Sequence, residues 1–135
     1  MPVYICTTTQ STLDANTKAA LAADITRIHS RINGVPSTYV NVVFHELAPD
    51  DIYTDAAPGR PLIINGWTRT GHPEALTSQL VSEIAGAATD VTGIDADRVL
   101  VIIQNSPARF AMEGGRTLPE PGQEKAWIQA RGTAT

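Results

Sequence analysis

The second residue of the chain is the first candidate for chemistry, because proline is the only coded residue whose free N-terminal amine is secondary. Cells normally remove a methionine that precedes proline, and its removal here would expose the amine of Pro2. An exposed α-amine titrates at about pH 7.7–8.0. It can therefore serve as a base when it is neutral or as an acid when it is charged. If Met1 stays in place, the Pro2 nitrogen is a tertiary amide, neither basic nor nucleophilic.

The remaining chemistry-bearing residues do not form a recognisable metal or cofactor motif. His29, His45 and His72 lack the spacing of a helical ligand pair, and His45-Glu46 has no second histidine of the zinc-protease motif. The sequence also lacks a Gly-x-Ser-x-Gly elbow, a phosphate-binding lysine loop, a dinucleotide glycine fingerprint and a Cys-x-x-Cys pair. We therefore expect no metal and no cofactor.

Composition narrows the class of protein further. The 135 residues fit one domain, and 42% hydrophobic with 18% charged residues is typical of a folded globular chain. The net charge is −4 and the Lys and Arg residues are scattered, so we expect neither a nucleic-acid partner nor a membrane surface. The single cysteine, Cys6, and the absence of a signal-peptide pattern predict a cytoplasmic protein.

The spacing of apolar residues predicts the elements that position Pro2. Leu21, Ile25, Ile28 and Ile32 recur at helical spacing, and Gly34 follows as a stop signal. The predicted elements are strands over 3–9, 39–44, 62–67 and 99–103, helices over 14–33 and 73–92, and a loop, possibly a hairpin, over 47–60.

The two halves of the chain repeat each other. Leu21 aligns with Leu80 and Val42 with Val101, each pair 59 positions apart (80 − 21 and 101 − 42). The repeat predicts a single domain, 1–135, of two βαβ units over 2–46 and 61–105, followed by an arm over 106–135. We expect an α/β fold in which a four-stranded mixed sheet carries both long helices on one face.

The apolar run Val99–Ile103 and the C-terminal arm both indicate whether the chain forms an oligomer. A strand apolar on both sides of the pleat indicates burial on both faces, and two helices cover only one face. We therefore expect an oligomer. In the arm, Ser106-Pro107 predicts a short helix through about Glu113, and the rest is expected to be irregular, with Trp127 anchoring it to a neighbouring subunit.

With the Met-Pro-Val-Tyr start, the βαβ repeat and the short length, the chain resembles the tautomerase superfamily. More closely, it is similar to the cis-3-chloroacrylic acid dehalogenase group within it. The resemblance covers Pro2 to about Trp127, and its most specific stretches are 24–29, 66–71 and above all 107–122. It implies a homotrimer acting on a small carboxylate substrate.

The resemblance also implies site residues, position by position. Pro2, His29, Arg69 and Glu113 match the group's catalytic proline, helix histidine, first arginine and glutamate. The second arginine is replaced by His72, and the tyrosine of the last strand falls at Ile102, both substrate-binding positions. Imidazole lacks the bidentate fork of a guanidinium, and isoleucine has no proton to share. Efficient hydrolytic dehalogenation is therefore not expected.

The function predicted is that of a tautomerase that ketonises enols of 2-oxo acids, with promiscuous hydratase or dehalogenase side activity. Pro2 would move the proton, and His29 would orient an oxygen of the substrate. Arg69 would bind the substrate carboxylate, because it follows a strand at the sheet edge where the sites of α/β proteins gather. Purely structural roles also fit three of these residues: His29 lies on an apolar helix face, Glu113 precedes a helix stop, and His72 is next to Pro73. A cis-3-haloacrylate dehalogenase and a non-catalytic binding protein remain the alternatives.

Overall fold

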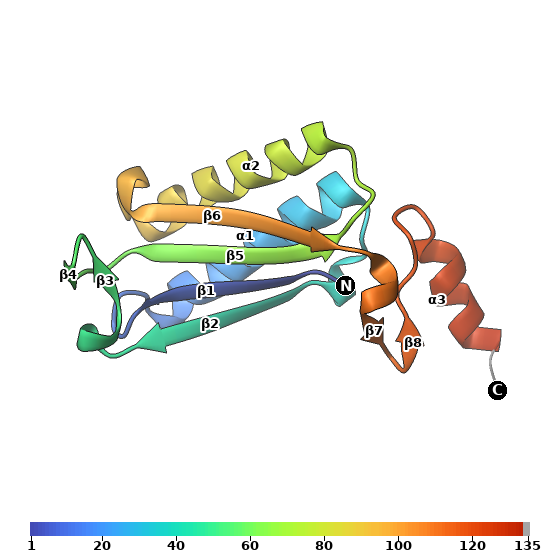
Figure 1. The fold of residues 1–135 in the computed structure, drawn as a ribbon, viewed down its shortest axis with the longest axis horizontal. Coiled ribbons are helices and arrows are strands. Elements are labelled where there is room, and N and C mark those ends of the chain that lie inside the picture. The colour runs from blue at the N-terminus through green and yellow to red at the C-terminus, as the bar shows by residue number, and fades with distance from the viewer. Residues whose placement is uncertain (134–135) are drawn as a thin grey trace.

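A single mixed sheet is the centre of the fold in the computed structural model, which describes residues 1–133. Its strands are β1 (Val3–Thr9), β2 (Asn41–Leu47), β5 (Leu62–Arg69) and β6 (Val99–Ser106). Their order is β2-β1-β5-β6, with parallel outer pairs and an antiparallel central pair. Both long helices, α1 (Ala15–Asn33) and α2 (Glu74–Thr92), lie on the same face of this sheet (Figure 1). The predicted α/β fold is confirmed.

Local chemistry sets where the helices begin and end. The Asp14 carboxylate accepts a hydrogen bond from the Thr17 backbone nitrogen at 2.7 Å and so caps α1. Gly34 and Gly93 end the two helices with φ of 70° and 72°, a left-handed conformation that favours glycine. Pro73 was predicted to be the first helical residue, but its ψ of 137° is extended, so it precedes α2 as the cap.

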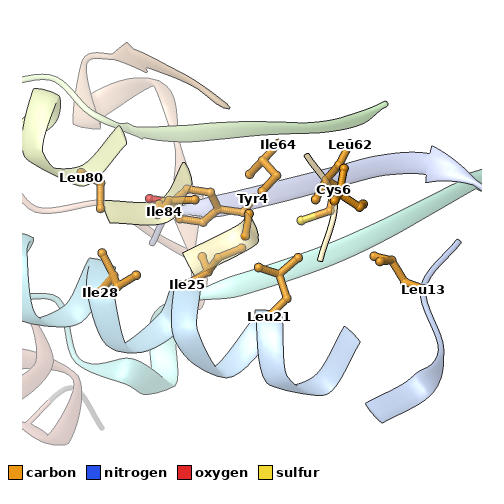
Figure 2. Packing of buried hydrophobic residues seen from close by; sticks show 12 residues of the cluster. Tyr4, Cys6, Leu13, Leu21, Ile25, Ile28, Leu62, Ile64, Leu80 and Ile84 are labelled. Atoms are coloured by element: carbon orange, nitrogen blue, oxygen red, sulfur yellow. The ribbon is translucent and has the colours of Figure 1, made fainter. Parts of the chain in front are cut away.

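The main core lies between the helices and the sheet. Figure 2 shows Leu21, Ile25 and Ile28 of α1 facing the strand residues Tyr4 and Cys6, all of them buried. The other buried members of this core are Leu13, Leu62, Ile64, Leu80, Ile84, Ala88 and Ile94. The predicted apolar face of α1 is confirmed, with Leu21, Ile25 and Ile28 buried and Ile32 packed at the edge of the core.

The repeat extends to the residues that precede the central strands. Pro2 comes directly before β1 and Pro61 before β5, again 59 positions apart (61 − 2). Because β1 and β5 are antiparallel, the two prolines lie at opposite ends of the sheet. The end near Pro61 carries the hairpin of β3 (Tyr53–Thr54) and β4 (Ala57–Pro58), as the predicted loop allowed (Figure 1). Short 3-10 turns are η1 (Ser37–Tyr39), η2 (Pro49–Asp51) and η3 (Ala96–Arg98).

The C-terminal arm is more ordered than the sequence predicted. Its elements are η4 (Ala108–Phe110), β7 (Met112–Glu113), β8 (Arg116–Thr117) and α3 (Glu124–Thr133). The predicted helix through Glu113 was wrong: one 3-10 turn ends at Phe110, because Gly114 and Gly115 adopt φ of 62° and 76° and turn the chain back into a hairpin. The prediction of an irregular tail was wrong as well, since α3 occupies much of it.

Trp127 of α3 anchors the arm within its own chain. Its ring contacts the Tyr39 ring, with centroids 5.7 Å apart, and the Arg116 guanidinium lies 3.8 Å from its centroid. The indole Nε1 donates to the Thr117 carbonyl oxygen at 2.8 Å. The contact expected with a neighbouring subunit is thus made, in this structure, with Tyr39, Arg116 and Thr117 of the same chain.

The sheet face away from the helices is uncovered and carries apolar side chains. Val43, Leu100 and Ile102 are 42%, 51% and 37% exposed. The expected burial of β6 on both faces is therefore not reached within one chain. Across the part of the chain that the structure describes, none of the helices is both long enough and apolar enough to cross a membrane.

Candidate active site

The start of the chain is buried at the sheet end that also carries β7, β8 and α3 (Figure 1). The Met1 side chain is fully buried, and its ammonium nitrogen lies 3.1 Å from Glu113 Oε1 and donates to the Tyr39 carbonyl oxygen. The Pro2 carbonyl oxygen accepts from the Asn41 backbone nitrogen at 3.2 Å, which fixes the chain as it enters β1. With Met1 attached, the Pro2 nitrogen is an amide; loss of Met1 would convert it to an amine at this spot.

A cavity of about 310 Å³ opens beside Pro2. Its lining residues are Met1, Pro2, Val3, Asn41, Trp67, Ala111, Met112, Glu113 and Leu118. Apolar walls with a few polar groups and a volume near 300 Å³ are typical of small-ligand pockets. The structure thus brings two of the predicted site residues, Pro2 and Glu113, to one cavity, although they come from opposite ends of the sequence.

The electrostatics of this end act on the N-terminal amine. Burial lowers the pKa of the Met1 ammonium below its ordinary value of 8.0. The hydrogen bond and charge of Glu113 oppose this effect, and the charge of Arg69 adds to it. The Pro2 nitrogen is three bonds from the Met1 nitrogen, so the two atoms are at most roughly 3.7 Å apart. An amine on Pro2 would therefore be subject to the same three influences.

Arg69 lies at the same end of the sheet as this cavity, does not line it, and is already paired. It is the last residue of β5, not a loop residue after the strand as predicted, and it is 1% exposed. Its Nη2 donates to Glu124 Oε1 at 2.6 Å and its Nη1 to the Pro119 carbonyl oxygen at 2.7 Å. Although burial disfavours ionisation of Glu124, the hydrogen bond from Arg69 holds the pKa of that carboxyl below its usual value. The Arg69 guanidinium is therefore already bound to a carboxylate of the same chain, that of Glu124.

His29 is a fully buried, neutral histidine on α1. Its Nδ1 shares a hydrogen bond of 2.7 Å with the Tyr4 hydroxyl, and its Nε2 lies 3.4 Å from Asn33 Nδ2. Burial, helped by the nearby charges of His72, the N-terminus and Arg69, lowers its pKa to about 3. The histidine is therefore uncharged at neutral pH and packs against Tyr4, with ring centroids 5.6 Å apart.

His72 and Ile102 occupy different surroundings. His72 Nε2 is buried without a hydrogen-bond partner in the described residues. Burial and the charge of Arg69 lower the pKa of His72, against the influence of Glu124. Arg69, His29 and His72 thus form one cluster, in which the charge of Arg69 acts on both histidines, and none of the three lines the Pro2 cavity. Ile102 lies apart from it, on the uncovered face of the sheet, and does not line the cavity.

The structure adds three residues that the sequence predictions did not name: Tyr4, Glu124 and Arg116. Arg116 lies opposite Glu113 in the β7–β8 hairpin, and its Nη1 donates to the Trp127 carbonyl oxygen at 2.5 Å. Its Nε and Nη2 are buried without a partner in the described residues. Arg116 lies within the 107–122 stretch that carries the family resemblance, so the sequence offered a signal for its position. The sequence could not predict which of its N–H groups have no partner.

No group of three or more His, Cys, Asp or Glu side chains within residues 1–133 is arranged to hold a metal ion. The polar groups that line the Pro2 cavity are the N-terminal nitrogen, the Glu113 carboxylate and the Asn41 amide, and the charge of Arg69 acts on the N-terminal amine from outside this lining. Such a set can move protons and bind anions.

Comparison with known proteins gives the class. Residues 1–131 match the sequence model of the family described as “Putative oxalocrotonate tautomerase enzyme”. The solved structure of native Ps01740 is 39% identical, with a TM-score of 0.81 over 82% of this chain and 99% of that one. The chain therefore belongs to this tautomerase family.

Two further structures extend the comparison. N1, a member of the cis-3-chloroacrylic acid dehalogenase family, is 25% identical, with a TM-score of 0.90 over 94% of this chain and 90% of that one. An asymmetric trimer of a fused 4-OT protein is 20% identical, with a TM-score of 0.79 over 93% and 98%, and shares the fold. Among curated protein sequences, none matches the chain.

Proposed function

We propose that the chain, once Met1 has been removed, is a cofactor-independent tautomerase that ketonises enols of 2-oxo acids with the Pro2 amine as general base. The observation that carries the proposal is that Pro2 and Glu113 line one cavity, where the Met1 amine lies 3.1 Å from Glu113 Oε1 and burial lowers its pKa, an effect that an amine on Pro2 would share. A lowered pKa leaves more of the amine neutral near pH 7, which a base requires. Membership of the tautomerase family supports the same reaction class.

The proposed reaction moves one proton. The neutral Pro2 amine takes the proton of the enol hydroxyl at C2, which leaves an enolate with the electrons of that O–H bond on the oxygen; these electrons form the C2 carbonyl as C3 is protonated. The electrons of the C2–C3 double bond then take the proton back from the Pro2 ammonium at C3. The amine ends as it began, so the step needs no oxidant, reductant or cofactor.

The other predicted residues take supporting roles in this proposal. Glu113 holds the amine in place and stabilises the ammonium formed after the first step. Arg69 supplies the positive charge for the substrate carboxylate, which must share the guanidinium with Glu124. His29, which is neutral and hydrogen-bonded to Tyr4, keeps the proposed role of orienting a substrate oxygen, although it does not line the cavity.

We also propose that the chain assembles as a homotrimer through its uncovered sheet face. Val43, Leu100 and Ile102 expose apolar surface there, which association would bury. Fused 4-OT proteins of the same fold are described as trimers, which supports this assembly. Analytical ultracentrifugation tests the assembly, and a monomer at micromolar concentration would contradict the proposed trimer.

A second candidate is hydrolytic dehalogenation of cis-3-haloacrylates, favoured by the similarity to N1. His72 and Ile102 stand where that group has a second arginine and a tyrosine, so the reaction lacks two of its usual groups. Chloride release from cis-3-chloroacrylate well above background would favour this candidate. A third reading, a binding protein without catalysis, predicts no turnover of any enol or haloacrylate.

The decisive experiment begins with the intact mass of the purified protein, which must lack one methionine. Ketonisation of phenylenolpyruvate is then followed for the wild type, Pro2→Ala and Pro61→Ala. Pro61 is the matched control, because it holds the corresponding position before β5 and has no free amine. We expect Pro2→Ala to lose roughly 10²-fold or more in kcat and Pro61→Ala to stay near wild type. Equal rates for Pro2→Ala and wild type would overturn the proposal.

A further inference from the structure

The buried side chain of Met1 occupies a chamber with walls of its own. Val35, Ala108 and Leu118 are buried against it, and Tyr39, Trp67 and Trp127 pack at its edges; we call this set the Met1 chamber. The Met1 side chain is fully buried there. Terminal residues are usually exposed and poorly ordered unless something holds them. An apolar compartment at the first residue is thus a specific feature of this fold.

The chamber and the Pro2 cavity share their inner boundary. Met1, Trp67 and Leu118 belong both to the chamber and to the lining of the cavity of about 310 Å³. Loss of Met1 therefore does two things at one place: it frees the Pro2 amine, and it joins the emptied chamber to the cavity. The amine then faces apolar walls that previously contacted methionine.

The walls are held by bonds that do not involve Met1. Trp67 Nε1 donates to Ser106 Oγ at 2.8 Å, and Trp127 Nε1 donates to the Thr117 carbonyl oxygen at 2.8 Å. The Leu118 backbone nitrogen donates to the Ala111 carbonyl oxygen at 3.0 Å. Because folded cores relax only partly around a removed side chain, these contacts keep the chamber open.

The polar groups lie at the border of the chamber, while its interior is apolar. The Glu113 carboxylate and the Tyr39 carbonyl oxygen, which bind the Met1 ammonium, are acceptors that attract an amine and repel an anion. The Arg116 guanidinium lies over the Trp127 wall with Nε and Nη2 unpartnered in the described residues. An anionic head is thus favoured beside a guanidinium, that of Arg69 proposed above or that of Arg116, and an apolar tail in the chamber.

We propose that the Met1 chamber is the pocket for the apolar substituent of the substrate, and that it selects 2-oxo acids whose side chain beyond C2 is about as long as that of methionine. The inference rests on the proposed function, since it names the substrate class for that same site. A retained Met1 then blocks the site twice, by masking the amine and by filling the pocket.

Binding of inert analogues tests this independently of turnover. On protein whose mass shows that it begins at Pro2, calorimetry compares lactate, 2-hydroxyhexanoate and 3-phenyllactate, which are the reduced forms of 2-oxo acids with short, methionine-length and aryl side chains. Burying three more methylenes predicts that 2-hydroxyhexanoate binds roughly tenfold or more tightly than lactate. Equal affinities for these two acids, or no binding of either, would overturn the inference.

Variants of the chamber sharpen the test. Ala108→Leu fills the chamber and is expected to abolish the preference for the longer chain, whereas Ala87→Leu, at the edge of the main core, keeps it. Leu118→Ala enlarges the chamber and is expected to raise the affinity for 3-phenyllactate relative to 2-hydroxyhexanoate. If Ala108→Leu does not fold, Leu118→Ala and the wild-type series decide the matter.

Failure of this inference is distinguishable from failure of the proposed function. A chain-length preference in binding without phenylenolpyruvate turnover supports the chamber and removes the tautomerase. Turnover that depends on Pro2, without a chain-length preference, supports the tautomerase and removes the chamber.

Discussion

Arg69 Nη2 donates to Glu124 Oε1 across 2.6 Å, and this buried pair joins the last residue of β5 to the first residue of α3. The Gly122 backbone nitrogen also donates to both carboxylate oxygens of Glu124, at 3.0 and 3.2 Å. The carboxylate therefore ties the C-terminal helix to the cluster of Arg69, His29 and His72. The helix is held at the site by the same charge that a substrate carboxylate would use.

Removing this carboxylate should destabilise the protein. Glu124→Ala leaves the buried Arg69 with only the Pro119 carbonyl oxygen, and an uncompensated buried charge costs about 3–5 kcal/mol of unfolding free energy. Urea denaturation measures the loss. The control is Glu83→Ala, which removes the exposed pair with Arg31 and is expected to change stability far less. Equal losses at the two positions would contradict a structural role for the buried pair.

The same pair predicts a pH dependence. Because the folded pKa of Glu124 lies below the ordinary value of 4.5, its contribution is present above that pH and is lost as pH falls through the folded pKa. The stability difference between wild type and Glu124→Ala should therefore shrink below about pH 4. A difference that stays constant down to acid unfolding would show that ionisation of Glu124 is not involved.

His29 gives a second pH dependence of known sign. Its folded pKa of about 3 lies below the ordinary 6.5, so the unfolded chain binds the proton more readily. The stability from the neutral imidazole is complete above pH 6.5 and falls at lower pH, by up to about 1.4 kcal/mol per pH unit. Unfolding measured between about pH 7 and pH 5 should show this slope in wild type and lose it in His29→Gln. His45→Gln, on the exposed strand β2, is the matched control for loss of an imidazole.

Two glycines offer a packing test. A Cβ added at Gly66 would lie 2.5 Å from Tyr4 Cε1 and 2.8 Å from Ile103 Cδ1, so Gly66→Ala must displace the tyrosine that holds His29. Overpacking of this kind costs about 1–3 kcal/mol. Gly86→Ala, in α2 with nothing within 4 Å of its Cβ, should gain up to about 1 kcal/mol through helix propensity. Thermal unfolding of both variants checks the opposite signs.

Cys6 should be inert in the native protein. It is fully buried, and burial raises the pKa of its thiol to about 12, so the reactive thiolate is scarce near neutral pH. Ellman's reagent is expected to label it only after denaturation. Rapid labelling of the folded protein would mean that this part of the core opens.

The elements that position the site followed from local pattern, while the arm did not. Helical spacing of residues such as Leu21 and Ile25 already marks the face that must be buried, whatever the rest of the chain does. The β7–β8 hairpin and α3 depend instead on contacts between distant residues, such as Trp127 with Tyr39. Such contacts leave no periodic trace in the sequence, so the arm was predicted as a short helix and a loose tail.

The candidate site shows the same division. The position of Pro2 directly after the first methionine is enough to predict its chemistry. Glu113 was predicted from the family resemblance. The pairing of Arg69 with Glu124 spans 55 positions, and no spacing rule connects them. Whether a guanidinium is free or bound depends on how the arm folds back, which is a tertiary property.

The repeat has a consequence for the number of reactive centres. Pro61 stands before β5 as Pro2 stands before β1, beside a separate cavity of about 500 Å³ at the other end of the sheet. Its nitrogen is bonded to the Arg60 carbonyl carbon, so removal of the first methionine cannot turn it into an amine. Joining two equivalent βαβ segments into one polypeptide therefore sacrifices one of two terminal amines. The end that carries Pro61 is released from the demands of proton transfer, and its residues are free to diverge.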